Sequence, residues 1–383
     1  MPSFGTRFPP HAKDVYNILS KRRLQFQLCQ IRALTKSDQA PSPESAAMAQ
    51  SDSQTVVLPD HRTLGYAEYG NPNGKPLLFF HGFPSSRLEA YALDSIALRR
   101  NIRLLALDRP GFGLSSHDPH RHINDWPTDV QAFASKLGLS RFMVLGASGG
   151  GPYALACAKQ LPSEMLSAVG VLAGAAVWDR GIRTKGVPWY SRLTYLAANY
   201  WPFGLRVLSA ALVGTMRWIM TLRFVERKID AALEAATKAK IAKEKKESDV
   251  LQSDEVHLIA VSNVEDVVEQ LPVRTAAQRR EGLMGLFFGG FAHGTSGFVH
   301  EARLLSQDWG FKFEDITYDR VQVWHGSKDV NAPVERVRDM AERIPHCILK
   351  EFDENHFGMG YHLEQVLDEL IAEANHSDTR DHL

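Results

Sequence analysis

The residue of this sequence best suited to nucleophilic chemistry is a serine flanked by glycines. Ser148 lies in Gly146-Ala147-Ser148-Gly149-Gly150, between an apolar segment that predicts a buried strand and a small-residue segment that predicts a helix. A serine on such a tight strand-to-helix turn is held away from the backbone, with its hydroxyl exposed. Gly146 and Gly150 fit this turn because a Cβ at either position would collide across it. The alternative is a glycine-rich loop with an incidental serine, and the rest of the chain decides between the two.

A serine hydroxyl is a weak nucleophile at neutral pH, so it needs a base, and the base needs an acid that orients it. In open parallel sheets such groups follow the carboxyl ends of strands. Asp329 follows the predicted strand 321–324, and His356 follows the predicted strand 347–352. The chain order Ser148, Asp329, His356 is the order expected for a hydrolase with this serine turn.

Composition limits the class of protein. The 383 residues are long enough for one large domain with an insertion, and 44% of them are hydrophobic, enough for a substantial core. The 44 basic and 44 acidic side chains cancel, so we expect no nucleic-acid partner. The three cysteines, Cys29, Cys157 and Cys347, show neither disulfide nor zinc spacing, which favours a reducing compartment. We therefore expect a cytoplasmic protein.

Residues 1–53 differ from the rest and are interpreted as a basic arm followed by a linker. Up to Lys36 there are seven Lys or Arg residues and one acid, and residues 37–53 are rich in Ser, Pro, Ala and Gln. A basic, acid-poor start is typical of an organellar presequence, so organellar targeting is the alternative location. A packed arm or an oligomerisation arm would have the same composition. The oligomeric state is left open, a homodimer included.

Short apolar strands alternate with helices over residues 54–177 and 310–383. This pattern predicts an α/β core built on a doubly wound, mostly parallel sheet, which begins with an antiparallel hairpin over 55–69. The strands expected after the hairpin are 76–80, 102–107, 141–145, 168–173, 321–324 and 347–352. The core residues therefore come from two separate parts of the chain.

Residues 178–309 interrupt the alternation and are predicted to form a helical cap. The segment is strand-poor, and its first third contains four of the seven tryptophans. Its most apolar window, Phe203 to Leu222, is interrupted by Arg206 and Arg217. We therefore expect a packed helix there and no transmembrane span.

Taken together, the motifs resemble the α/β-hydrolase superfamily, in the serine branch with a helical cap, from about Thr55 to Ala374. Five segments agree in order: His81-Gly82-Phe83-Pro84, Asp108 to Ser115, Gly146 to Gly150, His325 to Asp329 and Glu354 to Gly358. The resemblance implies Ser148 as nucleophile, His356 as base and Asp329 as its partner. It also implies an oxyanion hole formed by the backbone N–H groups of Phe83 and Gly149. It implies neither a cofactor nor a metal.

The expected function is that of a soluble hydrolase for a carboxylic ester of a small-to-medium apolar molecule, acting through an acyl-enzyme on Ser148. C–C bond hydrolysis, thioester hydrolysis and acyl transfer on the same triad are alternatives. A ligand-binding receptor, or a non-hydrolytic cyclase or lyase that uses the capped pocket, is a further alternative. Asp179, after the strand 168–173, is the alternative acid. A serine in place of an aspartate at position 148 argues against dehalogenase and epoxide-hydrolase chemistry.

Several other polar residues are interpreted as structural. The three histidines of 117–122 lie in a proline-containing loop without a carboxylate at suitable spacing, so we expect no metal there. His81 is expected to anchor the oxyanion loop, with Asp108 and Arg109 bracing it. His325 is expected to be a hydrogen-bonded histidine at a strand end.

Overall fold

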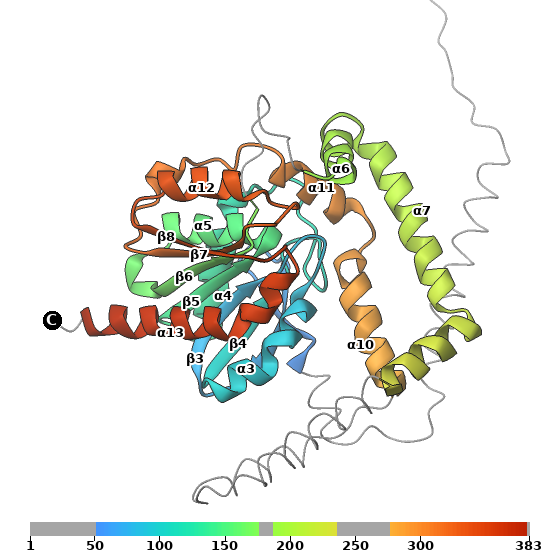
Figure 1. The fold of residues 1–383 in the computed structure, drawn as a ribbon, viewed down its shortest axis with the longest axis horizontal. Coiled ribbons are helices and arrows are strands. Elements are labelled where there is room, and N and C mark those ends of the chain that lie inside the picture. The colour runs from blue at the N-terminus through green and yellow to red at the C-terminus, as the bar shows by residue number, and fades with distance from the viewer. Residues whose placement is uncertain (1–50, 176–186, 236–275, 381–383) are drawn as a thin grey trace, which may run out of the picture. The chain divides into compact units, whose positions relative to one another are not determined.

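An eight-stranded sheet forms the centre of the fold (Figure 1). The structure, a computed structural model, describes residues 51–175, 187–235 and 276–380. The chain divides into two units, Met1–Met48 and Ala49–Leu383, and every described residue belongs to the second. The predicted N-terminal arm therefore lies outside the described residues, except for its last three positions.

The strands follow the order β1-β2-β4-β3-β5-β6-β7-β8 across the sheet. Strands β1 and β2 pair antiparallel, as predicted, β2 also pairs antiparallel with β4, and all later pairs are parallel. The doubly wound, mostly parallel sheet is confirmed. The strand bounds are β1 Gln54–Val57, β2 Thr63–Gly70, β3 Lys75–Phe80, β4 Ile102–Leu107, β5 Phe142–Ala147, β6 Leu166–Leu172, β7 Val321–Gly326 and β8 Cys347–Phe352.

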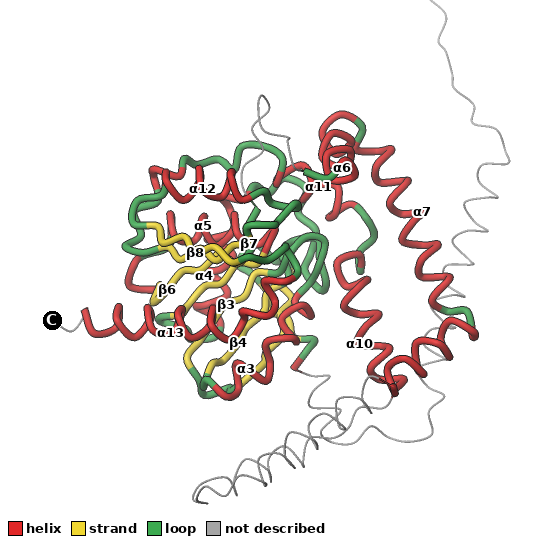
Figure 2. The backbone as a smooth tube through the Cα atoms, in the orientation of Figure 1, coloured by secondary structure: helices red, strands yellow, loops and turns green. Residues whose placement is uncertain are grey.

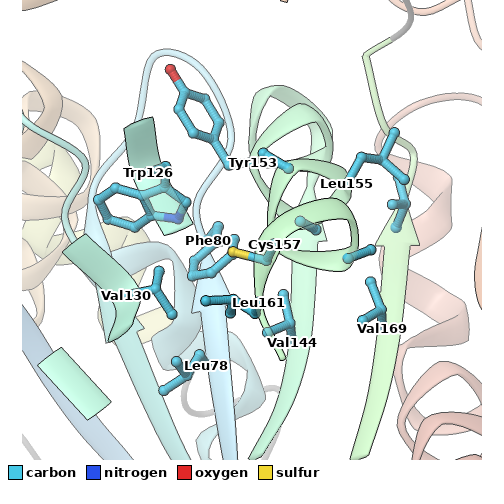
Figure 3. Packing of buried hydrophobic residues seen from close by; sticks show 14 of the residues in the cluster. Leu78, Phe80, Trp126, Val130, Val144, Tyr153, Leu155, Cys157, Leu161 and Val169 are labelled. Atoms are coloured by element: carbon cyan, nitrogen blue, oxygen red, sulfur yellow. The ribbon is translucent and has the colours of Figure 1, made fainter. Parts of the chain in front are cut away.

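Helices cover both faces of the sheet, as Figure 2 shows. Side chains of a strand alternate between faces, so the continuous apolar runs read from the sequence supply two cores. In β3, Leu78 and Phe80 join one core, whereas Leu77 and Phe79 join the other. The first core packs under α4, α5 and α12 (Figure 3) and the second under α3 and α13. The helix bounds are α3 Asp94–Arg99, α4 Trp126–Lys136, α5 Gly151–Gln160, α12 Val334–Arg343 and α13 Leu363–Arg380.

Between β6 and β7 the described residues form helices and no strand. These are α6 Trp189–Tyr200, α7 Pro202–Met220, a helical segment at 223–235, α10 Ala276–Phe288 and α11 Ser296–Leu305. Residues 176–186 and 236–275 lie outside the described residues, so the cap boundaries stay a prediction. The expectation of a packed helix at Phe203–Leu222 was wrong in one respect, because Gly204 is the only buried residue of α7. By length and composition α7 could cross a membrane, and 6% of its apolar window is buried.

A buried ion network joins α11 to the core. The Glu301 carboxylate accepts hydrogen bonds from Arg109 Nε at 3.0 Å, from the Arg121 guanidinium and from the Tyr153 hydroxyl at 2.9 Å. Glu301 and Arg109 are fully buried. Burial alone would raise the pKa of Glu301, but the two guanidinium groups beside it hold that pKa below its usual range. The acid is therefore an anion in the folded protein, and it is the only acid among the described residues that pairs with Arg109 or Arg121.

We expect Glu301→Gln to lower the free energy of unfolding by about 3–5 kcal/mol at neutral pH, since it leaves buried guanidinium charge unpaired. The folded-state pKa lies below the unfolded value of about 4.3, so this contribution is present above that pH and is lost as the pH falls through the folded pKa. Urea unfolding at several pH values measures it. The exposed Glu314→Gln, which breaks a surface pair with Arg343, is the control and should change little. If the loss of unfolding free energy in Glu301→Gln does not become smaller at low pH, Glu301 is not the ionised partner of the two arginines.

Candidate active site

Ser148 lies at the turn between β5 and α5, which a short 3-10 helix, Ser148–Gly150, connects. Its φ of +49° is a left-handed conformation that non-glycine residues seldom adopt. A Cβ at Gly146 would overlap the carbonyl oxygen of Gly150, and one at Gly150 would overlap the carbonyl oxygen of Phe80. The predicted steric reason for the two glycines is therefore confirmed. The strained serine is held by packing from both sides.

The predicted oxyanion donors lie next to each other. A Cβ placed on Gly149 would be 3.2 Å from the backbone nitrogen of Phe83 and 2.7 Å from its Cβ. A Cβ placed on Gly82 would be 3.4 Å from Ser148 Cβ. Strand β3 lies between β4 and β5, so the chain leaves β3 and β5 in opposite directions at this edge. Such a switch point is where ligands bind in open α/β sheets.

The structure also pairs the predicted base with the predicted acid. His356 Nδ1 lies 2.7 Å from Asp329 Oδ2, and Asp329 Oδ1 accepts the N–H groups of Asn331 at 2.8 Å and Ala332 at 2.9 Å. Asp329 follows β7 and is buried, and His356 follows β8. The carboxylate favours the tautomer that carries its proton on Nδ1. Nε2 is left to accept a proton, because no described residue forms a hydrogen bond with it.

The loop that carries Phe83 is braced as expected. The Arg109 guanidinium donates to the carbonyl oxygens of His81 and, at 3.1 Å, Gly82, while Arg109 N–H donates to His81 Nε2 at 3.2 Å. Asp108 accepts the Arg87 N–H at 2.7 Å and its guanidinium at 2.8 Å. Burial, and after it the charge of Arg109, holds the pKa of His81 well below its ordinary value. His81 is thus a neutral anchor for the loop.

Glu89 is a carboxylate at the site that sequence analysis missed. It lies in a 3-10 helix, Arg87–Leu93, and Oε2 accepts the Gly82 N–H at 2.9 Å. A Cβ on Gly82 would be 3.3 Å from Glu89 Oε2 and 3.4 Å from Ser148 Cβ, so Glu89 and Ser148 flank the same glycine.

The charge state of the Glu89 carboxylate depends on burial and on its hydrogen bonds. Burial raises its pKa, while hydrogen bonds from Ser85 and Gly82, and then the charges of Arg109 and His356, act in the opposite direction. Among the described residues none forms an ion pair with Glu89. The only signal in the sequence was an acid seven residues after Gly82. This spacing alone could not identify Glu89 as a site residue, because the sequence does not show that the 3-10 helix Arg87–Leu93 folds back toward Gly82.

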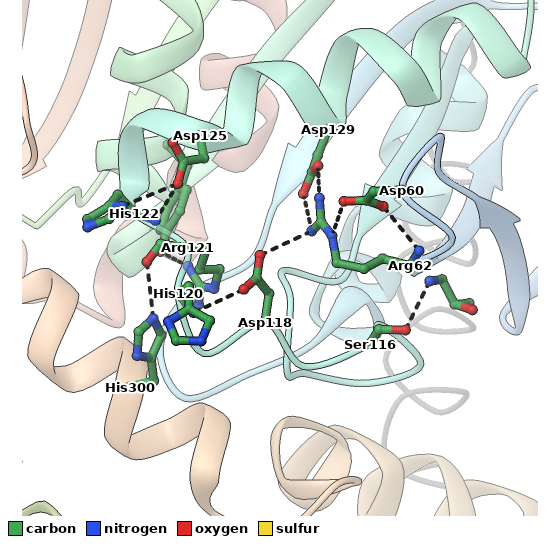
Figure 4. Close-up of polar contacts among 12 residues, drawn as sticks. Asp60, Arg62, Ser116, Asp118, His120, Arg121, His122, Asp125, Asp129 and His300 are labelled. Carbon is green, nitrogen blue, oxygen red and sulfur yellow. Dashed lines mark hydrogen bonds and ion pairs between the residues drawn. The ribbon is translucent and has the colours of Figure 1, made fainter.

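Of the other histidines, His325 borders the predicted acid, with its Nε2 3.5 Å from Asp329 Oδ2. His325 Nε2 lies 2.7 Å from the carbonyl oxygen of Ala332, which confirms a hydrogen-bonded histidine. In the loop 117–122, His122 Nδ1 lies 3.4 Å from Asp125 Oδ2, and the backbone N–H of His120 donates to Asp118 Oδ1 (Figure 4). A cavity of about 300 Å³ beside this loop is lined by Arg62, Arg121 and Trp126 among others, and by none of the predicted catalytic residues. Asp179, the alternative acid, lies outside the described residues.

Comparison with known proteins agrees with this geometry. Residues 75–363 match the family described as the alpha/beta hydrolase fold, so the chain belongs to the α/β-hydrolase family and is an enzyme of that class. The enol-lactonase from Burkholderia xenovorans LB400 has a similar fold, with a TM-score of 0.52 and 15% sequence identity, over 83% of this chain and 100% of that one. The predicted family and fold are both confirmed.

Two sequence relatives match shorter segments. A proline iminopeptidase from Xylella fastidiosa (strain 9a5c) is 31% identical over 119 residues, which are 28% of this chain and 36% of the relative. A non-heme haloperoxidase from Rhodococcus erythropolis is 32% identical over 97 residues, which are 25% of this chain and 35% of the relative. The chain thus spans about a third of the length of these relatives.

We expect Asp329→Asn to lower kcat by roughly 10⁴-fold, because a neutral amide cannot stabilise the imidazolium and favours the wrong tautomer. Hydrolysis of p-nitrophenyl acetate measures the effect. Asp179→Asn is the matched control and should leave kcat close to that of the parent. The reverse result would assign the acid to the segment after β6.

Proposed function

We propose that this protein is a serine hydrolase that cleaves a carboxylic ester of a small-to-medium apolar molecule through an acyl-enzyme on Ser148. The observation that supports the proposal is that Ser148 and Gly149 lie next to the loop of Gly82 and Phe83 at the switch point of the sheet. The hydrogen bond between His356 and Asp329 supplies an oriented base.

In the proposed reaction, Ser148 Oγ attacks the ester carbonyl carbon while His356 Nε2 takes the hydroxyl proton. Asp329 stabilises the resulting imidazolium, and Phe83 and Gly149 donate to the oxygen that becomes negative. His356 then passes the proton to the leaving alcohol as the C–O bond breaks. Water, deprotonated by His356, attacks the acyl-enzyme, and the acid leaves as Ser148 regains its proton.

Apolar side chains of α11 beside the oxyanion loop support an apolar substrate. Phe298 stacks on Phe83 with ring centroids 5.1 Å apart, and Leu305 Cδ1 would lie 3.4 Å from a Cβ on Gly149. Each CH₂ group that such a wall removes from water contributes about 0.8 kcal/mol. Esters with larger acyl groups should therefore bind more tightly until the space is full.

Ser148→Ala should abolish labelling by a fluorophosphonate probe and reduce ester turnover by roughly 10⁴–10⁶-fold, because it removes the nucleophile. Gel fluorescence and p-nitrophenyl ester assays measure the two effects. Ser163→Ala, at an exposed serine of the 3-10 helix Ser163–Met165, is the control. Labelling that persists in Ser148→Ala but not in another serine variant would identify a different nucleophile.

A second candidate function follows from Glu89: cleavage of an acyl group that carries a cationic amine. Buried charges in proteins are normally paired, and Glu89 is a partly buried carboxylate beside the proposed nucleophile that forms no ion pair with a described residue. A substrate ammonium near the scissile carbonyl would supply the missing charge. Relatives named proline iminopeptidase are consistent with a substrate that carries a basic nitrogen.

The alanine and isobutyrate esters of p-nitrophenol test this directly, since they differ by an ammonium group in place of a methyl group. Glu89→Gln keeps the size of the side chain and its acceptor for Gly82. We expect it to lower kcat/KM for the alanine ester relative to the isobutyrate ester by about 10- to 150-fold, the value of a hydrogen bond to a charged group.

The same ratio in the parent should depend on pH. The amine preference needs an ionised Glu89, so it should be present at neutral pH and lost as the pH falls through a pKa that burial places above the usual value for glutamate. If the kcat/KM ratio of the alanine ester to the isobutyrate ester is near one in the parent, or is the same in Glu89→Gln as in the parent, Glu89 only positions the loop.

A further inference from the structure

Helices α6 and α7 each present a row of exposed apolar side chains. On α6 the exposed residues Trp189, Leu193, Leu196 and Tyr200 recur at helical spacing and form one stripe. On α7 the same is true of Leu208, Leu212, Met216 and Ile219. Large aromatic residues are 75% (Trp189), 80% (Tyr200) and 74% (Phe203) exposed. We call these residues the α6–α7 face. Exposed apolar patches of this kind mark interaction sites.

The other sides of these helices are already occupied. Asn199 of α6 donates to Ser306 Oγ at 2.7 Å, and Arg217 of α7 donates to the carbonyl oxygens of Phe288 and Phe291. Thr295 Oγ1 donates to the carbonyl oxygen of Arg206 at 2.9 Å. These contacts orient the helices against α11 and the segment before it, and leave the α6–α7 face outward.

The segment that carries this face is cationic. Between Val187 and Val225 the chain has four arginines and no acidic residue, although basic and acidic residues balance over the whole chain. Arg192, Arg206 and Arg223 are exposed, and none of them forms an ion pair with a described residue. The complementary surface must therefore be both apolar and anionic.

We propose that the α6–α7 face docks on an anionic phospholipid bilayer. Interfacial helices combine aromatic and aliphatic residues with arginine or lysine in this way, and bind through buried apolar area together with attraction to anionic headgroups. Tryptophan and tyrosine suit the headgroup level, where one part of the ring is apolar and the other meets water. Trp189 and Tyr200 supply two such rings on the α6–α7 face, and Tyr190, Trp201 and Trp218 are exposed beside it in the chain.

The helices lie on the bilayer and do not cross it. The charge-free part of α7 between Arg206 and Arg217 is ten residues, or about 15 Å at 1.5 Å per residue. The hydrocarbon core is about 30 Å thick. A span would also break the hydrogen bonds of Arg217 with the carbonyl groups of Phe288 and Phe291.

A second copy of the chain and the basic N-terminal residues would each cover the α6–α7 face less well than an anionic bilayer. In a symmetric dimer formed through this face, the same patch of each copy meets itself, so arginines would meet arginines without an acid between them. The N-terminal residues up to Lys36 are themselves basic, with seven cations and one acid. Residues 236–275 contain acids as well as apolar residues and are kept as an alternative for the experiment.

Vesicle flotation of the full chain tests the proposal, with phosphatidylcholine vesicles and with vesicles that also contain about 30% phosphatidylglycerol. The parent should bind the anionic vesicles more tightly, and salt should weaken the binding. Arg192→Gln, Arg206→Gln and Arg223→Gln combined should lower the partition coefficient roughly 100-fold, at about fivefold for each arginine. Leu208→Gln, Leu212→Gln and Met216→Gln combined should lower it about tenfold or more per residue.

Matched substitutions elsewhere control for a general loss of surface hydrophobicity. Val57→Gln, Leu98→Gln and Ile348→Gln change residues that are 56%, 50% and 38% exposed outside the α6–α7 face, and should leave binding unchanged. Circular dichroism and turnover of p-nitrophenyl acetate verify that each variant is folded. The binding readout does not depend on hydrolysis.

The proposal is overturned if the full chain binds neither vesicle, or if the α6–α7 variants bind as well as the parent. A chain that binds only after residues 236–275 are replaced by a glycine–serine linker would show an intramolecular cover. A concentration-dependent dimer that the α6–α7 variants dissociate, without vesicle binding, would show a contact between two copies.

Discussion

The steric constraint at the serine turn is the feature on which the site depends. Strand β5 and helix α5 approach so closely that Gly146 and Gly150 have no room for a Cβ, and β3 closes the turn from the other side through the carbonyl oxygen of Phe80. Ser148 is held with φ at +49° as a result. Because β3 also leads into the oxyanion loop, one packing arrangement positions the proposed nucleophile and both proposed N–H donors. Rigid strands thus supply the geometry, and the loops need little flexibility to complete it.

A second constraint couples the oxyanion loop to α11. Arg109 donates to the carbonyl groups at the end of β3 with one part of its guanidinium and to Glu301 with another. Phe298, on the same helix as Glu301, stacks on Phe83. A buried pair of this kind stabilises less than its Coulomb attraction implies, since both charges lose their hydration. It fixes relative position instead, and here it ties a helix outside the sheet to the loop that would hold the oxyanion.

The sequence was informative where a residue's role depends on its neighbours in the chain. Strand periodicity placed β4 and β8 at their observed bounds, and the rule that site residues follow strand ends selected Asp329 and His356 as partners. The sequence was not informative where a residue's role depends on contacts with residues far away in the chain. Glu301 meets Arg109 across 192 residues, and Glu89 meets the serine only through Gly82. The packing of α7 was mispredicted for the same reason: an apolar window shows that a helix needs a partner, without showing whether the chain supplies one.

Exposed apolar area on α6 and α7 is unfavourable in water, and the exposed arginines of the same segment restrict which surface can cover it. A protein core would accept the apolar residues but not three arginines that pair with no described residue. An acidic protein surface would accept the arginines but leave the aromatic rings in contact with water. An anionic bilayer accepts both, because hydrocarbon lies within a few ångströms of the phosphate layer. Helix α11 contacts the inner sides of α6 and α7 and also the oxyanion loop, so one helix connects the proposed bilayer-docking helices to the loop beside the proposed nucleophile.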